Sequence, residues 1–225
     1  MKESVTSFLS NILSVILGIF ITFTIQGMID RSKEKKETRS SLELVRSELV
    51  TNMDDISIMA DYLHQEKASA EYILSNKDSL DSCPEDSVNY HSSMIFADVS
   101  FSLSQDALEL LKMSSVFQSI KSNGLSMKII RAYDSCSSIV YNLNRHLSSR
   151  DARFENSIDK ETAGLYALDG NISIKDFIKT DYGLYSIKWL TAQPDPENFT
   201  DVSDIQEAVH AIDSYLGKKR RTNRN

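Results

Sequence analysis

Residues 8–28 read FLSNILSVILGIFITFTIQGM and form the central part of a stretch, between Glu3 and Asp30, that contains no charged residue. Taken as a helix with a rise of about 1.5 Å per residue, this run is roughly 31 Å long, which matches the hydrocarbon core of a bilayer. It is longer than the apolar region of a cleaved signal peptide and lacks a small-residue cleavage site. We therefore predict an uncleaved, single-pass transmembrane anchor over residues 1–30.

Basic residues are concentrated on the C-terminal side of the predicted span. Lys2 stands alone before it, whereas a group of lysines and arginines follows it: Arg31, Lys33, Lys35, Lys36 and Arg39. Because basic flanks favour the cytoplasmic side, we predict a protein of the bacterial inner (cytoplasmic) membrane with its long C-terminal part in the cytoplasm. An extracytoplasmic C-terminal part is the alternative. The basic group is also expected to contact the surface of the membrane lipid.

Small and polar residues recur along the span at spacings of four, three, four, four and four residues, which places them on one face of a helix. They are Ser7, Asn11, Ser14, Gly18, Thr22 and Gln26. Helices in lipid associate through small residues and through polar side chains that bond across the contact. We expect this stripe to pack against a second copy or another membrane protein, since Asn11 needs a partner in apolar surroundings. Alternatively, the hydroxyls bond to their own backbone and Gln26 lies at the interface.

The chain has 225 residues and a formal net charge of −7, but the charge is unevenly distributed. Residues 40–217 contain 14 basic and 28 acidic residues, whereas the tail KKRRTNRN after Gly217 contains five basic residues and no acid. An acidic body argues against a nucleic-acid-binding surface. The tail is either a solvated end, with Lys218 and Lys219 favoured at the negative end of the preceding helix, or a segment that rests on anionic lipid.

Residues 31–75 are predicted to form a long juxtamembrane helix that continues the span, because no glycine or proline occurs between Ser32 and Cys83. Its apolar residues alternate spacings of three and four, which is a heptad pattern. This seam consists of Leu42, Val45, Leu49, Asn52, Ile56, Met59 and Leu63. The pattern fits both an intramolecular bundle and a coiled coil, and Asn52 either sets the register or faces water.

Residues 76–217 are predicted to be a helical soluble domain that packs with residues 40–75, and residues 218–225 a basic tail. Residues 76–92 are polar, contain Pro84 and are predicted to be a loop. Ser104 is a candidate N-cap for the helix that follows, and Gly124 closes this part of the domain.

The most regular helix follows, with apolar spacings of four, three, four, three and four. These residues are Ile129, Tyr133, Cys136, Val140, Leu143 and Leu147. Residues 172–190 are predicted to form an interrupted helix, unless residues 172–174 form a short strand. Its inward residues are predicted to be Phe177, Ile178, Tyr185 and Trp189. Ser203 and Gln206 resemble a capping box for the last helix, and Gly217 suits its C-terminal end.

The predicted fold class is therefore all-α. An N-terminal transmembrane helix runs into a long helix, and an antiparallel helical bundle follows.

No recognisable catalytic, cofactor or metal motif occurs: there is no Gly-rich phosphate loop, no HExxH, no GxSxG and no Arg-x(4–6)-His pattern of helical HEPN ribonucleases. Cys83 and His91 lack the companions that a zinc site needs. We therefore predict no enzyme activity, no cofactor and no metal.

Residues 10–20 (SNILSVILGIF) and 107–133 (ALELLKMSSVFQSIKSNGLSMKIIRAY) resemble a family of uncharacterised small membrane proteins common in Bacteroidota. That family has an apolar N-terminal helix of the type EIxxVxxGIxxAL, a charged helix, and a segment similar to AYEELKSSGxLxxIxxxELxxxIxxYY. The second segment aligns without gaps, and its matches are Ala107, Glu109, Leu111, Lys112, Ile120, Leu125, Ile130 and Tyr133. Leu108 and Ser115 depart from the pattern. The resemblance implies the single-span, helical architecture and carries no activity.

These features favour a single-pass, membrane-anchored helical interaction protein that self-associates or binds a partner membrane protein. The alternative is an oligomeric pore-forming or membrane-disrupting effector of bacterial defence, in which polar stripes from several copies line a channel. A packed stripe buries Asn11, Ser14 and Thr22 between helices, whereas a pore wets them. An enzyme whose site consists of unrecognised residues is a third hypothesis.

Overall fold

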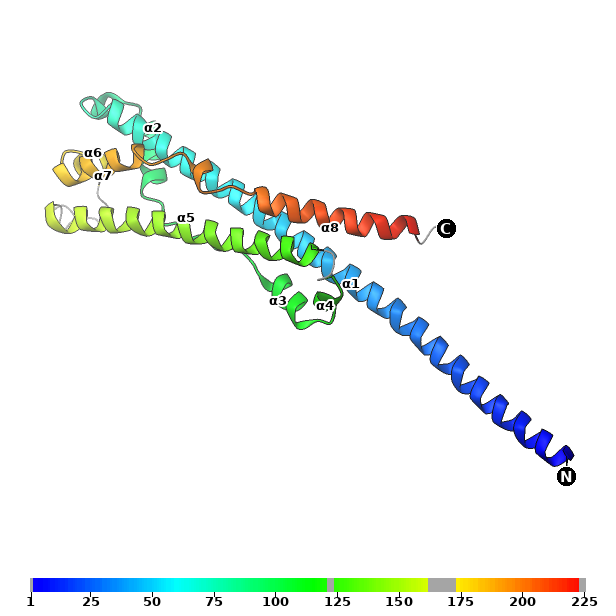
Figure 1. Cartoon of the computed structure of the whole chain (residues 1–225). Coiled ribbons are helices and arrows are strands. Elements are labelled where there is room, and N and C mark those ends of the chain that lie inside the picture. Colours follow the sequence, from blue (N-terminus) through cyan, green and yellow to red (C-terminus); the bar gives the residue numbers. More distant parts are fainter. Residues whose placement is uncertain (1, 121–123, 162–172, 223–225) are drawn as a thin grey trace.

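The computed structural model describes residues 2–120, 124–161 and 173–222, and within these ranges every regular element is a helix (Figure 1). Inside these elements, side chains are described at residues 17, 20–117, 120, 124–155 and 173–217. The α-helices are α1 (Lys2–Ser75), α2 (Glu85–Ile95), α3 (Asp106–Met113), α4 (Val116–Ile120), α5 (Leu125–Glu161), α6 (Ile174–Phe177), α7 (Asp181–Thr191) and α8 (Ser203–Thr222). Two 3-10 helices, η1 (Leu80–Ser82) and η3 (Pro196–Asn198), lie in connections. The prediction of an all-α fold is confirmed for this part of the chain.

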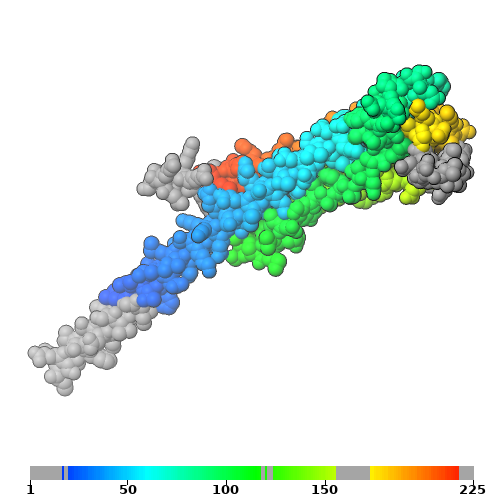
Figure 2. Space-filling model, turned by 180° about the vertical axis from the view of Figure 1, so that it is seen from behind, coloured from blue at the N-terminus to red at the C-terminus, as the bar shows by residue number. Residues whose placement is uncertain are grey.

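The first helix, α1, is uninterrupted over 74 residues, which is about 110 Å at 1.5 Å per residue. Its C-terminal half lies in the bundle, and its N-terminal half projects away from the other helices (Figure 1). Seen from behind, the bundle is an elongated body with the free half of α1 extending from one end (Figure 2). Thr38 is the first buried residue among the described side chains. Because no glycine or proline follows until Pro84, the helix enters the bundle without a kink.

Helices α1 and α5 run in the same direction. Three side-chain contacts join them, and in each the residue on α5 comes 84 or 85 positions after its partner on α1: Glu48–Tyr133, Asn52–Cys136 and Glu66–Arg150. The prediction of an antiparallel bundle is therefore wrong for this pair. The reason is that residues 76–124 return the chain along α1 before α5 begins.

The chain after α6 runs in the opposite direction to α1. Residue numbers fall on one side as they rise on the other in three ion pairs: Arg46–Asp213, His64–Glu197 and Lys67–Asp195. The segment from Asp195 to Asp213, which includes the first half of α8, is thus antiparallel to α1, as expected. Helix α8 also packs closely against α5. The central bundle therefore consists of the parallel helices α1 and α5 and the shorter, antiparallel helix α8 (Figure 1).

Two apolar clusters form the core. The larger joins α1, α3, α4, α5 and α8, and the smaller lies at the far end between α1, α2, α6, α7 and the C-terminal part of α5. The buried face of α5 is wider than a single seam, because α5 contacts α1 and α8. Ile139 is therefore buried as well, and Val140 on the predicted face is only half-buried.

The prediction of a loop over residues 76–92 is wrong, because these residues contain η1 and most of α2. Pro84 directly precedes α2, at a helix start where a missing N–H leaves no bond unmade. Glu85 and Asp86 occupy the first turn, which favours acidic residues. Val88 and Ile95 are buried in the smaller apolar cluster, where α2 packs against α1, and this burial stabilises the short, polar helix.

Residues 173–191 form two helices with separate N-caps, and residues 173 and 174 show no strand. The hydroxyl of Ser173 accepts a hydrogen bond from the Lys175 N–H at 3.2 Å, and Thr180 accepts one from Gly183 at 2.9 Å. The second start changes the phase of the helix. Tyr185, predicted to face inward, is 59 % exposed instead.

The last helix differs from the prediction at both ends. Asp201 caps its start, because Oδ1 accepts a hydrogen bond from the Ser203 N–H at 2.9 Å. Gly217 does not end the helix, which continues to Thr222. The prediction that Ser104 is the N-cap of α3 is also wrong. Helix α3 begins at Asp106, so Gln105 occupies the N-cap position.

Gly183 and Gly217 are a matched pair for testing this packing. A Cβ at Gly183 would overlap the carbonyl oxygen of Phe177, whereas a Cβ at Gly217 meets nothing within 4 Å. Gly183→Ala should destabilise the protein by about 1–3 kcal/mol, and Gly217→Ala should stabilise it by up to about 1 kcal/mol because alanine favours a helix. Both changes in unfolding free energy can be measured by urea titration of the full-length chain in detergent, monitored by circular dichroism. Equal effects would contradict this packing of α7.

Candidate functional site

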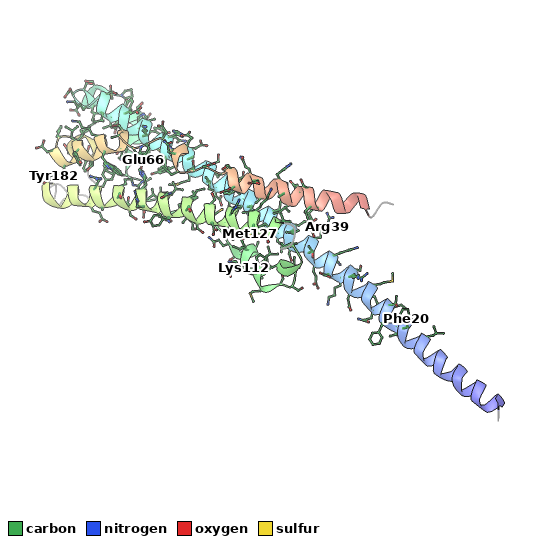
Figure 3. The ribbon with its side chains drawn as sticks, viewed as in Figure 1. Phe20, Arg39, Glu66, Lys112, Met127 and Tyr182 are labelled. Atoms are coloured by element: carbon green, nitrogen blue, oxygen red, sulfur yellow. The ribbon has the colours of Figure 1, made fainter. Side chains whose placement is uncertain are left out.

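A band of exposed apolar side chains covers the described part of the free half of α1. Its members are Leu17, Phe20, Ile21, Phe23, Ile25, Met28 and Ile29, all between 52 and 73 % exposed. At 3.6 residues per turn they are distributed over roughly two thirds of the helix circumference. Their complete burial would be worth on the order of 10 kcal/mol, from about 1.5–3 kcal/mol per buried side chain. Phe20 points away from every other helix, so the bundle leaves this band uncovered (Figure 3).

The predicted span over residues 8–28 lies largely outside the described side chains. No helix in the described part of the chain is long and apolar enough to cross a membrane. The hydroxyl of Thr24 donates a hydrogen bond to the carbonyl oxygen of Phe20 at 2.8 Å, one turn earlier in the same helix. This bond satisfies the hydroxyl without water.

The predicted association stripe is described only at its C-terminal end. Ser7, Asn11, Ser14 and Gly18 lie outside the described side chains. Thr22 and Gln26 are exposed on the third of the helix that the apolar band leaves free. Gln26 Nε2 donates to Asp30 Oδ1 at 3.2 Å, which links the end of the stripe to the first charged residue after it.

The basic segment, residues 31–39, lies between the apolar band and the bundle. Its cations Arg31, Lys33, Lys35 and Lys36 are exposed, and Arg39 is half-buried where the bundle begins. Lys33 and Arg39 pair with Glu37 at 4.0 Å and Glu43 at 2.8 Å. Among the described side chains, Arg31, Lys35 and Lys36 have no carboxylate within 4.0 Å. The segment therefore presents a positive surface next to the apolar band.

The seven residues of the predicted seam all lie in the core, at 5 % exposure or less: Leu42, Val45, Leu49, Asn52, Ile56, Met59 and Leu63. They are covered by the chain's own α3, α5 and α8. Asn52 faces the interior: Nδ2 donates to the carbonyl oxygen of Ser104 at 2.9 Å, and Oδ1 accepts from its N–H at 3.2 Å. The seam thus has no free face for a second copy.

Glu48 caps α3 from α1. Its carboxylate accepts hydrogen bonds from Tyr133 at 2.6 Å, from the Ser104 hydroxyl at 2.5 Å and from the Ala107 N–H at 3.0 Å. Burial alone would raise the pKa of Glu48, but these bonds lower it below the ordinary value. For Tyr133, burial first and then the bond to Glu48 raise the pKa. The folded state therefore stabilises the ionised form of Glu48, and this carboxylate holds the N-terminus of α3 against α1.

A second polar cluster crosses the middle of the bundle, where Glu66 on α1 meets Arg150 on α5. The charged groups are 2.8 Å apart, and both side chains are only 2–3 % exposed. Arg150 also donates to Tyr62 at 2.9 Å, to the carbonyl oxygen of Ala97 at 3.0 Å and to Asp151 at 2.8 Å. Burial opposes the charge on Arg150, but pairing with Glu66 raises its pKa. Burial and the nearby Glu66 carboxylate raise the pKa of Tyr62 to about 12.

Sequence reasoning missed both Glu66 and Arg150, although a signal was present. The seam of α1 continues past Leu63 with spacings of three, four and three, through Glu66 to Ala70 and Ile73. The apolar face of α5 continues past Leu147 in the same way to Arg150. A lone charge in each of two apolar seams, with opposite sign, is the pattern of a buried pair.

The surroundings of this cluster offer little room for a ligand. His146 stacks on Trp189 with ring centroids 5.4 Å apart, and its Nε2 lies 3.7 Å from Glu66. The cavity beside it measures about 10 Å³, the size of one water molecule. No group of three metal-binding side chains occurs in the described ranges. An open groove of about 380 Å³ runs between α1 and α3, with Leu44 and Leu110 on its walls.

Comparisons of the chain with family models, with curated proteins and with solved structures find no match. The resemblance to small membrane proteins of Bacteroidota therefore stays a prediction.

The buried pair can be tested by removing one charge or both. Arg150→Met should destabilise the full-length protein by about 3–5 kcal/mol, because Glu66 is left buried without its partner. Adding Glu66→Leu should recover most of this loss. Lys112→Met, which removes an exposed pair with Glu109, should cost less than about 1 kcal/mol. Urea unfolding in detergent compares the variants, and a double variant as unstable as Arg150→Met would contradict the proposed pairing energy.

Proposed function

We propose that this protein is a membrane-anchored helical interaction protein that is held in the bacterial inner membrane by the free half of α1 and self-associates through it. The exposed apolar band of residues 17–29 carries the proposal. Apolar side chains over two thirds of a helix, with no protein to cover them, match the hydrocarbon interior of a bilayer in chemistry.

The order of segments along α1 supports a membrane anchor. The apolar band is followed directly by the basic segment, and the first buried residue of the bundle, Thr38, comes nine residues after Ile29. Nine helical residues cover about 14 Å, and the headgroup layer on one side of a bilayer is about 5–8 Å thick. The bundle would therefore start just beyond the headgroups, with the basic segment among them.

The basic segment also supports a cytoplasmic bundle. Arg31, Lys33, Lys35, Lys36 and Arg39 all follow the apolar band, and only Lys2 precedes it. Basic residues close to a span favour the cytoplasmic side.

Self-association is assigned to the span because the other candidate surface is occupied. The heptad seam of α1 is buried inside its own bundle, so it does not serve as a coiled-coil interface. Thr22 and Gln26, the described end of the predicted stripe, lie on the third of the free helix that the apolar band does not occupy. Small and polar residues suit contact between helices in lipid.

Charges placed in the apolar band test the anchor. Phe20→Asp with Ile21→Asp should release the protein from membranes, since each buried Asp costs about 2.5–3.5 kcal/mol near the centre of a span. The control is Leu44→Asp with Ile58→Asp, two exposed apolar residues of the bundle part of α1. Alkaline carbonate extraction and flotation of expressed full-length protein measure the outcome. Retention of both variants in the membrane would refute the anchor.

Substitutions in the stripe test self-association. Asn11→Leu with Gly18→Leu should reduce the wild-type oligomer to a monomer, because the close, polar contact is lost. Ile16→Leu with Phe20→Leu, on the opposite side of the same helix, should leave the stoichiometry unchanged. Mass measurement of the full-length chain in detergent and in nanodiscs decides. A wild-type monomer would remove the self-association, and ion leakage from proteoliposomes would favour the pore.

A further inference from the structure

The C-terminal end of α8 lies at the same end of the bundle as the basic segment of α1. Helix α8 is antiparallel to α1, and Arg46 pairs with Asp213 at 2.6 Å. Thr222, the last described residue of α8, is nine residues beyond Asp213 and so lies level with a point nine residues before Arg46. That point is Glu37, inside the basic segment. The end of α8 lies at the end of the bundle from which the free half of α1 projects, and the two helices diverge there (Figure 1).

This part of α8 is strongly basic and helical. Residues 218–221 read KKRR, with no acidic residue after Asp213. The helix passes through Gly217 to Thr222, so these four positions are carried on a helix rather than on a loose tail. Cations are favoured at a helix C-terminus, where the backbone carbonyls give a partial negative charge.

The position of this end relative to a bilayer follows from the proposed anchor, on which this inference rests. If the hydrocarbon ends near Met28, the level of Glu37 is about 14 Å further along α1. The headgroup layer takes up about 5–8 Å of that length. The remaining gap is comparable to the Debye length of about 8 Å at physiological ionic strength. Residues 218–221 are thus within electrostatic range of charged headgroups.

We propose that residues 218–221 form a second contact with anionic phospholipid headgroups, displaced sideways from the basic segment of α1. The positive charge of residues 218–221 is complementary to the negatively charged cytoplasmic leaflet. The remainder of the domain is acidic and would be repelled by it, so these residues are the part of the bundle suited to this contact. One helix crossing a bilayer leaves the bundle free to tilt and to rotate about the helix axis. A second attachment away from that axis restricts both motions and fixes which face of the acidic bundle points toward a partner.

The experiment places a donor dye at the C-terminus of the full-length protein, through Asn225→Cys in a Cys83→Ser background. Acceptor dyes are attached to headgroups in vesicles of phosphatidylcholine, with or without phosphatidylserine. Energy transfer should be at least about twofold higher with phosphatidylserine and should lose this excess at 1 M salt, where the Debye length falls to about 3 Å. A dye at Asp78→Cys, at the opposite end of the bundle, should show no such change.

Two charge-matched variants complete the test. Replacing residues 218–221 by glutamine should abolish the excess transfer, whereas glutamine at four lysines of the opposite end should keep it: Lys77, Lys175, Lys179 and Lys188. Equal transfer in both lipids, or an excess that survives the 218–221 substitution, would overturn the second contact while flotation still reports an intact anchor. Protein that fails to float with the vesicles would instead overturn the anchor itself.

Discussion

The buried ion pair between Glu66 and Arg150 constrains the arrangement of the whole bundle. Each is the one charged residue in the buried seam of its helix, and each is almost completely removed from water. If α5 shifted along α1 by one turn, each charged group would face apolar side chains of the other helix. This would cost several kcal/mol per ion. The pair therefore specifies one register. Nearer the basic segment, Asn52–Cys136 has the same offset of 84 residues, and Glu48–Tyr133 has an offset of 85.

This register has consequences for the path of the chain. Two parallel helices joined in sequence need a connection that covers the full length of the first, and residues 76–124 supply it. Within that connection, α2 packs back along α1, and α3 is held at its N-terminus by Glu48. Helix α8 then closes the core from the opposite direction. Polar side chains of α1 thus help to position α3 and α5, in addition to the apolar seam.

The seams and helices were predictable because they depend on local periodicity. The seven seam residues of α1 and most of the apolar face of α5 are buried as their spacing indicates. The direction of α5 was not predictable, since it depends on pairing between residues 84 positions apart. Caps supplied from elsewhere, such as Glu48 at α3, are equally invisible to a local pattern. The helix within residues 76–92 was missed because short polar helices depend on tertiary burial more than on propensity. The orientation of Tyr185 was missed because the separate helix start at Thr180 changes the phase of the apolar face.

The unbroken course of α1 joins these results to the proposed function. A glycine or proline between the apolar band and Thr38 would act as a hinge, but residues 28–83 contain neither. A rotation or tilt of the free half would therefore move the bundle part of α1 with it, and α5 and α8 are joined to that part by the Glu66–Arg150 and Arg46–Asp213 pairs. In a protein whose copies associate through the free half, such a rigid connection would set the spacing and orientation of the acidic bundles. Interaction with a partner would then depend on geometry established at the membrane.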